Sequence, residues 1–226
     1  MQPDADTAVA QAAAETEVPS FRSRGWLTLA LLLRQPPTPE LLGRLADDCG
    51  FIGGDNELAA GWRELASAAA RSEPETLDDD FHDLFIGLGR GKLVPYASWY
   101  RTGFMMDRPL VALRRDLALL GFERHPDTRE PEDHAGALAE VMGMLADPAE
   151  GQDDATQRLF LDEHLDGWMP KLFRDLQAAA ATDFYRAAGR FGEAFLDFER
   201  AWLQANDSTT PAVGATRDTQ DRRTRQ

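Results

Sequence analysis

Apolar residues recur every three or four positions along most of this chain, and that spacing predicts helices. Leu110, Leu113, Leu117 and Leu120 follow it in the middle of the sequence. Near the end, a longer and mostly aromatic stripe has the same spacing and consists of Phe184, Ala188, Phe191, Phe195, Phe198 and Trp202. Residues so spaced share one face of a helix. No stretch alternates apolar and polar residues as a half-buried strand does. The sequence therefore predicts an all-α helical bundle of about eight or nine helices.

Two segments interrupt the helical pattern. The first, Gly87 to Tyr96, contains three glycines and Pro95, which favour leaving the helix. The second runs from His125 to Pro131 between two clear helical patterns, and Pro131 suits the first turn of the helix that follows. We expect both segments to act as joints between helices or as edges of a ligand site, the second of them near residues 125–134.

Both ends of the chain differ from the helical body. Residues 1–20 are rich in Ala, Gln and acids, and residues 206–226 are rich in Ser, Thr, Asp and Arg. Neither end has sustained apolar periodicity, so both are predicted to be disordered. Residues 21–205 are predicted to form the folded helical domain.

Charge and composition limit the possible partners. The formal net charge is -15, which disfavours binding to nucleic acid and favours basic partners, although acidity also serves solubility alone. No apolar run approaches the roughly 20 residues that cross a bilayer, and no export signal is evident. The single cysteine, Cys49, suits a reducing compartment. We expect a cytoplasmic protein without stable membrane insertion.

Common catalytic and ligand-binding motifs are missing. Leu93 follows Gly91-Lys92 where a phosphate-binding loop requires Ser or Thr. Ser98 lacks the glycine context of a nucleophile elbow. The histidines, which are His82, His125, His134 and His164, show no metal-ligand spacing. We therefore expect no cofactor, no metal site and no enzymatic activity.

The interrupting segments carry side chains that suit recognition. Tyr96, Trp99 and Tyr100 offer apolar area with polar tips and could line a groove or pack as ordinary core. His134 begins an otherwise apolar helix face. Glu130 and Asp133 place carboxylates near a helix N-terminus, where we expect them to be exposed at a groove edge and to pair with arginine.

These motifs in this order resemble the TorD/DmsD/NarJ family of assembly chaperones for molybdenum-containing redox enzymes. The resemblance spans roughly residues 21–205 and rests on Phe81-x-x-Leu84-Phe85, Gly91, Pro95-Tyr96-x-Ser98-x-Tyr100, Glu130-Pro131-Glu132-Asp133-His134 and Gln157-x-x-Phe160-x-x-x-His164-Leu165-x-x-Trp168. It implies an all-helical fold with a hinge at residues 130–134, present as a monomer or a domain-swapped homodimer. It also implies binding to the twin-arginine signal peptide of an apo molybdoenzyme catalytic subunit, which delays export until the cofactor is inserted.

The resemblance assigns peptide binding to Tyr96, Ser98, Tyr100, Pro131, Asp133 and His134. Many relatives carry Trp where this chain has Tyr96, which suggests a pocket shaped for a different peptide. With the residue-based expectations added, the predicted site comprises Tyr96, Ser98, Trp99, Tyr100, Glu130, Pro131, Asp133 and His134. Asp133, together with Glu130, is expected to pair with peptide arginine. His134 either titrates near physiological pH to modulate release or is structural.

Two other functions stay open. A NarJ-like chaperone would bind a catalytic subunit that is not exported. A nucleotide-dependent cofactor-insertion factor would need a phosphate-binding loop or clustered ligands, which the sequence does not supply.

Overall fold

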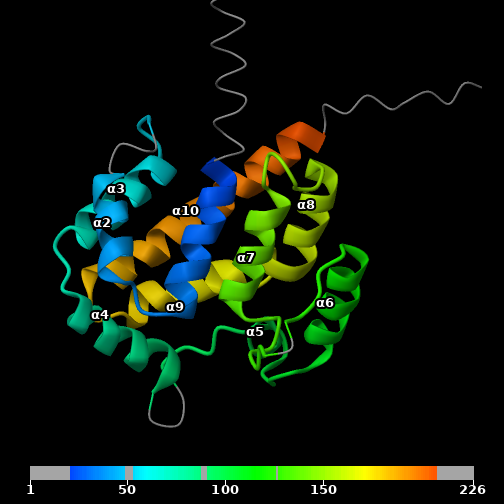
Figure 1. Ribbon diagram of the computed structural model, residues 1–226, viewed down its shortest axis with the longest axis horizontal. Coiled ribbons are helices and arrows are strands. Elements are labelled where there is room, and N and C mark those ends of the chain that lie inside the picture. The colour runs from blue at the N-terminus through cyan, green and yellow to red at the C-terminus, as the bar shows by residue number, and fades with distance from the viewer. Residues whose placement is uncertain (1–20, 49–52, 88–90, 126, 208–226) are drawn as a thin grey trace, which may run out of the picture.

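The computed structural model describes residues 21–48, 53–87, 91–125 and 127–207 (Figure 1). Within them the only strand-like feature is one isolated bridge, so the all-α prediction is confirmed. The predicted disorder of residues 1–20 and 208–226 lies outside the described residues. The last helix continues through Asp207, slightly beyond the boundary predicted at residue 206.

Ten α-helices follow one another in the described residues. A first helix at residues 21–34 is followed by α2 (Pro39–Asp47), α3 (Glu57–Ala69), α4 (Pro74–Phe81), α5 (Ala97–Thr102), α6 (Arg108–Leu119), α7 (Ala135–Leu145), α8 (Asp154–Leu161), α9 (Met169–Ala179) and α10 (Asp183–Asp207). Two of them continue into π-helical turns, α4 into η1 (His82–Ile86) and α8 into η2 (Asp162–Asp166).

The long helix α10 forms the centre of the core. Its predicted aromatic stripe is buried at Phe184, Phe191 and Phe195. Glycines allow other helices to approach it closely. A Cβ atom on Gly61 of α3 would lie 3.2 Å from the Phe191 Cα, and one on Gly192 would lie 2.3 Å from the Phe173 ring of α9.

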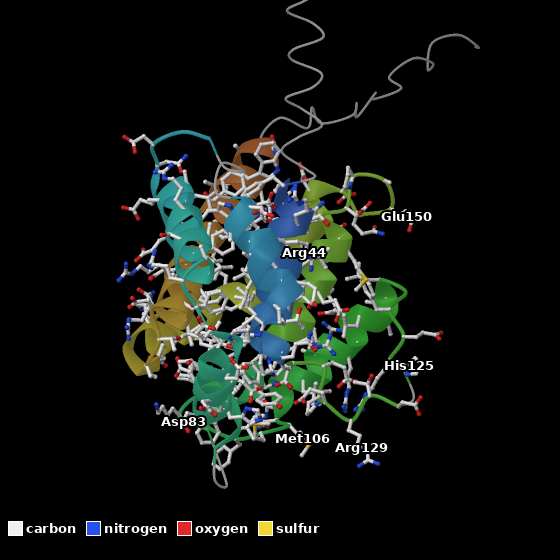
Figure 2. The ribbon with its side chains drawn as sticks, turned by 60° about the vertical axis from the view of Figure 1, so that its left-hand side comes forward. Arg44, Asp83, Met106, His125, Arg129 and Glu150 are labelled. Atoms are coloured by element: carbon white, nitrogen blue, oxygen red, sulfur yellow. The ribbon has the colours of Figure 1, made fainter. Side chains whose placement is uncertain are left out.

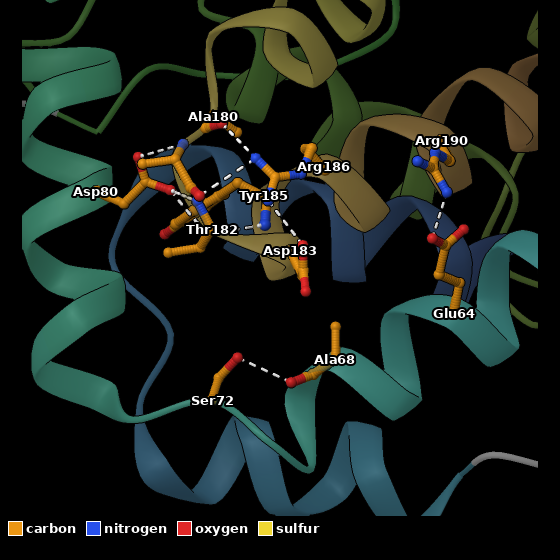
Figure 3. A network of polar contacts seen from close by, with 11 residues as sticks. Glu64, Ala68, Ser72, Asp80, Ala180, Thr182, Asp183, Tyr185, Arg186 and Arg190 are labelled. Carbon is orange, nitrogen blue, oxygen red and sulfur yellow. Dashed lines mark hydrogen bonds and ion pairs between the residues drawn. The ribbon is translucent and has the colours of Figure 1, made fainter.

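A buried carboxylate from α4 caps the start of α10 (Figure 3). Asp80 accepts hydrogen bonds from the Ala181 N–H at 3.1 Å, the Thr182 N–H at 2.8 Å and the Thr182 hydroxyl at 2.7 Å. Arg186 donates back to the Ala180 carbonyl oxygen at 2.8 Å. The two residues that precede the central helix are thus held in place by a carboxylate far away in sequence.

The first helix is tied to α10 by a buried ion pair. The Arg22 guanidinium donates to both oxygens of Glu199, at 2.8 and 3.0 Å, and both residues are almost fully buried. The Trp26 indole N–H donates to the same carboxylate at 2.9 Å. Removal of Glu199 would leave Arg22 with only the more distant carboxylate of Asp154, at 3.5 Å, and removal of Arg22 would leave the Glu199 carboxylate buried without this partner.

Three helices frame the functional region. Helix α6 stands at the right-hand edge of Figure 1, and α5 and α7 lie inward of it. Helix α7 begins at Ala135 with His134 as N-cap, so Pro131 precedes the helix and the prediction that it occupies the first turn is wrong. Among the described residues, no helix has both the length and the apolarity to cross a bilayer.

Candidate functional site

The two segments that interrupt the helical pattern lie against each other. Tyr96 and His134 form the isolated antiparallel bridge. Two backbone hydrogen bonds flank it, from the Ala97 N–H to the Asp133 carbonyl oxygen at 2.9 Å and from the Ala135 N–H to the Pro95 carbonyl oxygen at 2.8 Å. The start of α5 is thereby joined to the start of α7.

Asp133 caps the neighbouring helix. Its side chain is fully buried, and its Oδ2 accepts the Ser98 N–H in the first turn of α5 at 2.9 Å. The other carboxylate oxygen is buried without a hydrogen-bond partner. The expectation that Asp133 is exposed at a groove edge is therefore wrong, because its carboxylate satisfies a helix N-terminus inside the fold.

His134 caps its own helix and contacts Tyr96. Its Nδ1 accepts the Gly136 N–H at 3.1 Å, and its ring lies edge-on to the Tyr96 ring at 5.1 Å. Burial lowers its pKa to about 4, against the opposing effect of the Glu130 charge. His134 is therefore neutral at physiological pH, and the alternative that it titrates there is contradicted in the free protein.

Tyr96 links the bridge to the exposed carboxylate of Glu130. The Tyr96 hydroxyl donates to Glu130, which comes from the predicted hinge segment. Partial burial and this hydrogen bond raise the pKa of Tyr96 well above its ordinary value. The tyrosine is a hydrogen-bond donor at all physiological pH values and fixes the orientation of the glutamate.

The other α5 residues of the predicted site are tied into the body. Ser98 is fully buried, and its Oγ accepts an N–H of the turn after α5 at 3.1 Å. The Tyr100 hydroxyl donates to Asp175 at 3.0 Å, and its ring lies 5.4 Å from that of Trp168. Trp99 is half-buried. Helix α5 thus holds its polar tips in intramolecular contacts.

A groove of about 510 Å³ opens beside these residues. It lies between α6, the following loop and α7, and its apolar floor consists of Leu117, Phe122, Val141 and Met144. Among the predicted site residues only Glu130 and Pro131 line it. The floor was missed by sequence reasoning, because the exposure of Val141 and Met144 depends on how α6 packs against α7.

Acids and arginines alternate around the rim. Glu132 binds Arg114 through hydrogen bonds of 3.1, 3.1 and 2.9 Å, and Arg124 lies 4.0 Å away. Partial burial would raise the pKa of Glu132, but the bonds to Arg114 hold it below its ordinary value. Arg34 pairs with Glu140 on the opposite wall.

Two rim carboxylates are left without a cation. Glu123 and Glu130 both line the groove and both are exposed. In the part of the chain that the structure describes, neither forms an ion pair with Arg or Lys. The described part of the chain includes no cluster of three or more His, Cys, Asp or Glu side chains that could hold a metal ion. The groove therefore combines an apolar floor with unpaired negative charge, which suits a basic and apolar peptide.

Known proteins resemble part of this chain in sequence. The chain is 29% identical over 133 residues to the chaperone protein TorD of Vibrio cholerae serotype O1, covering 55% of this chain and 60% of that one. It is 31% identical over 100 residues to TorD of a Psychrobacter species, covering 41% and 45%. The chain thus spans about three fifths, or less, of the length of these relatives.

A solved structure shows the same fold. The crystal structure of a protein described as a redox enzyme maturation protein from Archaeoglobus fulgidus superposes with a TM-score of 0.52 and 18% identity, over 81% of this chain and 93% of that one. The family model for the nitrate reductase delta subunit matches residues 53–174. That match extends over more than half of the 226 residues, and the chain therefore belongs to the nitrate reductase delta subunit family, the TorD/DmsD/NarJ family that its motifs resemble.

Proposed function

We propose that this protein is a cytoplasmic assembly chaperone that binds the twin-arginine signal peptide of an apo molybdoenzyme catalytic subunit. Binding would assist cofactor insertion and delay export until the subunit has folded. The observation that carries the proposal is the pair of unpaired carboxylates, Glu123 and Glu130, on the rim of an apolar groove. Membership of a family that includes TorD chaperones supports it.

The arrangement can distinguish such a peptide from other ligands. Arginine side chains bind carboxylates through two parallel hydrogen bonds, and consecutive arginines supply two such groups. Glu132 and Glu140 already hold arginines of this chain, so the incoming cations are directed to Glu123 and Glu130. Apolar residues of the peptide then cover Phe122, Val141 and Met144.

Calorimetry with a synthetic twin-arginine peptide tests the proposal. Glu123→Gln and Glu130→Gln should each weaken binding about two- to fivefold, as expected for exposed ion pairs. Glutamine keeps an oxygen that can accept the Tyr96 hydroxyl, so the local fold is preserved. Glu75→Gln, at an exposed position on α4, serves as the matched control and should bind as wild type. Equal affinity of all four proteins, or of a peptide with both arginines replaced by glutamine, would contradict the proposal.

A second candidate is favoured by the family description itself. A nitrate reductase delta subunit-like chaperone would bind a catalytic subunit that is not exported. Affinity purification from the native host should recover a large molybdoenzyme subunit in either case. A complete twin-arginine peptide should displace that subunit only if its own N-terminus carries the arginine pair.

A further inference from the structure

The groove continues into a second hollow along α7. The second hollow, of about 350 Å³, shares Phe122 and Met144 with the groove and is otherwise lined by residues that include Leu27, Gly143 and Leu145. On α7 the groove begins at Ala137, and the second hollow reaches Leu145. At about 1.5 Å per residue the shared wall is roughly 12 Å long. Figure 2 shows His125, on the groove, and Glu150, on the second hollow, on the same side of the molecule.

Uncovered apolar side chains line this wall. Leu27 is 38% exposed and Met144 is 42% exposed. Leu27 lies directly against α7, because a Cβ atom on Gly143 would be 2.8 Å from its Cδ2. Leu31, one turn further along the first helix, is also 38% exposed. Apolar surface arranged along a helix in this way suits an apolar segment of a partner.

Both ends of the wall carry carboxylates, and the number of exposed carboxylates without a cation differs between them. The groove end has two unpaired carboxylates, Glu123 and Glu130. At the other end, one oxygen of Asp147 accepts the Ala149 and Glu150 N–H groups at 2.8 and 3.0 Å, which leaves Glu150 as the exposed carboxylate. No Lys or Arg lines the second hollow among the described residues. Acidic residues of a peptide are therefore disfavoured at both ends. Arg34, Arg114 and Arg124 also line the groove end, but Arg34 and Arg114 are paired with Glu140 and Glu132. Two neighbouring cations thus find two exposed carboxylates at the groove end and one, Glu150, at the other.

We infer that the second hollow binds the apolar segment that follows the arginines of the client peptide. This inference rests on the proposed function and adds a direction to it. The arginines lie at Glu123 and Glu130, and the chain then runs along α7 towards Leu27 and Leu145. A wall of roughly 12 Å holds about four extended residues or about eight helical ones.

Photo-crosslinking of the wild-type protein tests the direction. One synthetic peptide carries a benzophenone side chain next to its arginines. A second set carries it about four or about eight residues further on, the positions that an extended or a helical chain places at the far end of the wall. Mass spectrometry should place the first crosslink in residues 117–134 and the second in residues 23–31 or 143–152. A reversed pattern, or both crosslinks within residues 117–134, would overturn the inference.

A matched pair of variants tests the contact. Leu27→Asp should weaken peptide binding about tenfold or more, whereas Leu159→Asp, at a 64% exposed leucine on α8, should leave it unchanged. Leu27→Ser and Leu159→Ser provide a milder pair if circular dichroism shows that Leu27→Asp is unfolded. If Glu130→Gln weakens binding and the Leu27 variants do not, only the second hollow is excluded. If wild type binds no twin-arginine peptide, the proposed function and this inference both fail.

Discussion

The buried carboxylate of Asp133 accepts the Ser98 N–H and so fixes the start of α5. Asp133→Ala removes that acceptor and should lower the free energy of unfolding by about 1–3 kcal/mol, because a buried N–H loses its partner. Asp133→Asn keeps an oxygen in place and should cost less than about 1 kcal/mol. Urea denaturation followed by circular dichroism measures both.

The same pair of variants separates a structural role of Asp133 from a binding role. Asp133→Asn removes the negative charge but keeps the cap, so its affinity for a twin-arginine peptide should match wild type. A large loss of affinity in this stable variant would instead support the expectation from the sequence that Asp133 pairs directly with a peptide arginine.

The buried ring of His134 makes stability depend on pH. Burial lowers its pKa to about 4 in the folded protein, whereas the unfolded chain takes up a proton near the ordinary value of about 6.5. The free energy of unfolding should therefore fall as pH drops through this interval, by roughly 3 kcal/mol in total at its acid end. The loss of stability should be small above about pH 6.5, where the His134 ring is neutral in both the folded and the unfolded protein.

His134→Asn provides the control for that dependence. Asparagine is a good N-cap and can accept the Gly136 N–H, but it does not titrate. The free energy of unfolding of His134→Asn near pH 7 should be close to that of wild type. Between about pH 6.5 and 4 it should fall less steeply than in wild type. The contribution of His164, whose pKa burial also lowers, is common to both proteins. Parallel pH profiles of the two would contradict the assignment to His134.

At the scale of elements, the segment that leads into the site is held against η1 by its backbone. The Leu93 N–H donates to the Leu84 carbonyl oxygen at 2.8 Å, and a Cβ atom on Gly91 would lie 2.5 Å from that oxygen. Gly91→Ala should destabilise the protein by about 1–3 kcal/mol, since backbone cannot move aside as a flexible side chain can. Gly43→Ala is the control: apart from its chain neighbours and the backbone of its own helix, no atom would lie within 4 Å of the added Cβ, and helix α2 should gain about 0.5–1 kcal/mol. The midpoint temperature of thermal denaturation should fall for Gly91→Ala and rise for Gly43→Ala.

Local periodicity predicted the helices of this chain well, but not the π-helical turns or the contacts at the helix ends. The stripes containing Leu113 and Phe191 became α6 and α10 because their spacing alone defines a buried face. The π-helical turns, by contrast, have no local signal. The caps of α5 and α10 come from Asp133 and Asp80, whose partners lie 35 and up to 102 positions away in sequence. Such contacts depend on tertiary packing, which spacing does not encode.

The residues predicted for the site only partly coincide with those that line the groove, because the lining also depends on tertiary packing. The motif at residues 130–134 lies beside the groove, and Glu130 and Pro131 line it. Its neighbour Asp133 faces inward because the backbone bridge between Tyr96 and His134 places its side chain beneath α5. Phe122 and Met144 were not predicted, since their exposure follows from the position of α6.

At the scale of the whole molecule, the net charge of -15 gives the protein a negative field. That field should attract a basic peptide from a distance and accelerate its association. Salt shortens the reach of the field, from about 10 Å at 0.1 M to about 3 Å at 1 M. Raising NaCl from about 50 mM to about 500 mM should therefore lower the affinity for a twin-arginine peptide about tenfold, mainly through the association rate.

Surface plasmon resonance separates the two rates. The control peptide carries glutamine in place of both arginines, and its affinity should change little with salt, because burial of apolar residues on Phe122, Val141 and Met144 does not depend on screening. If both peptides lose affinity equally, the acidic surface has no part in recognition and serves solubility alone. If only the dissociation rate of the arginine peptide rises, the short-range pairs at Glu123 and Glu130 dominate over the field of the whole molecule.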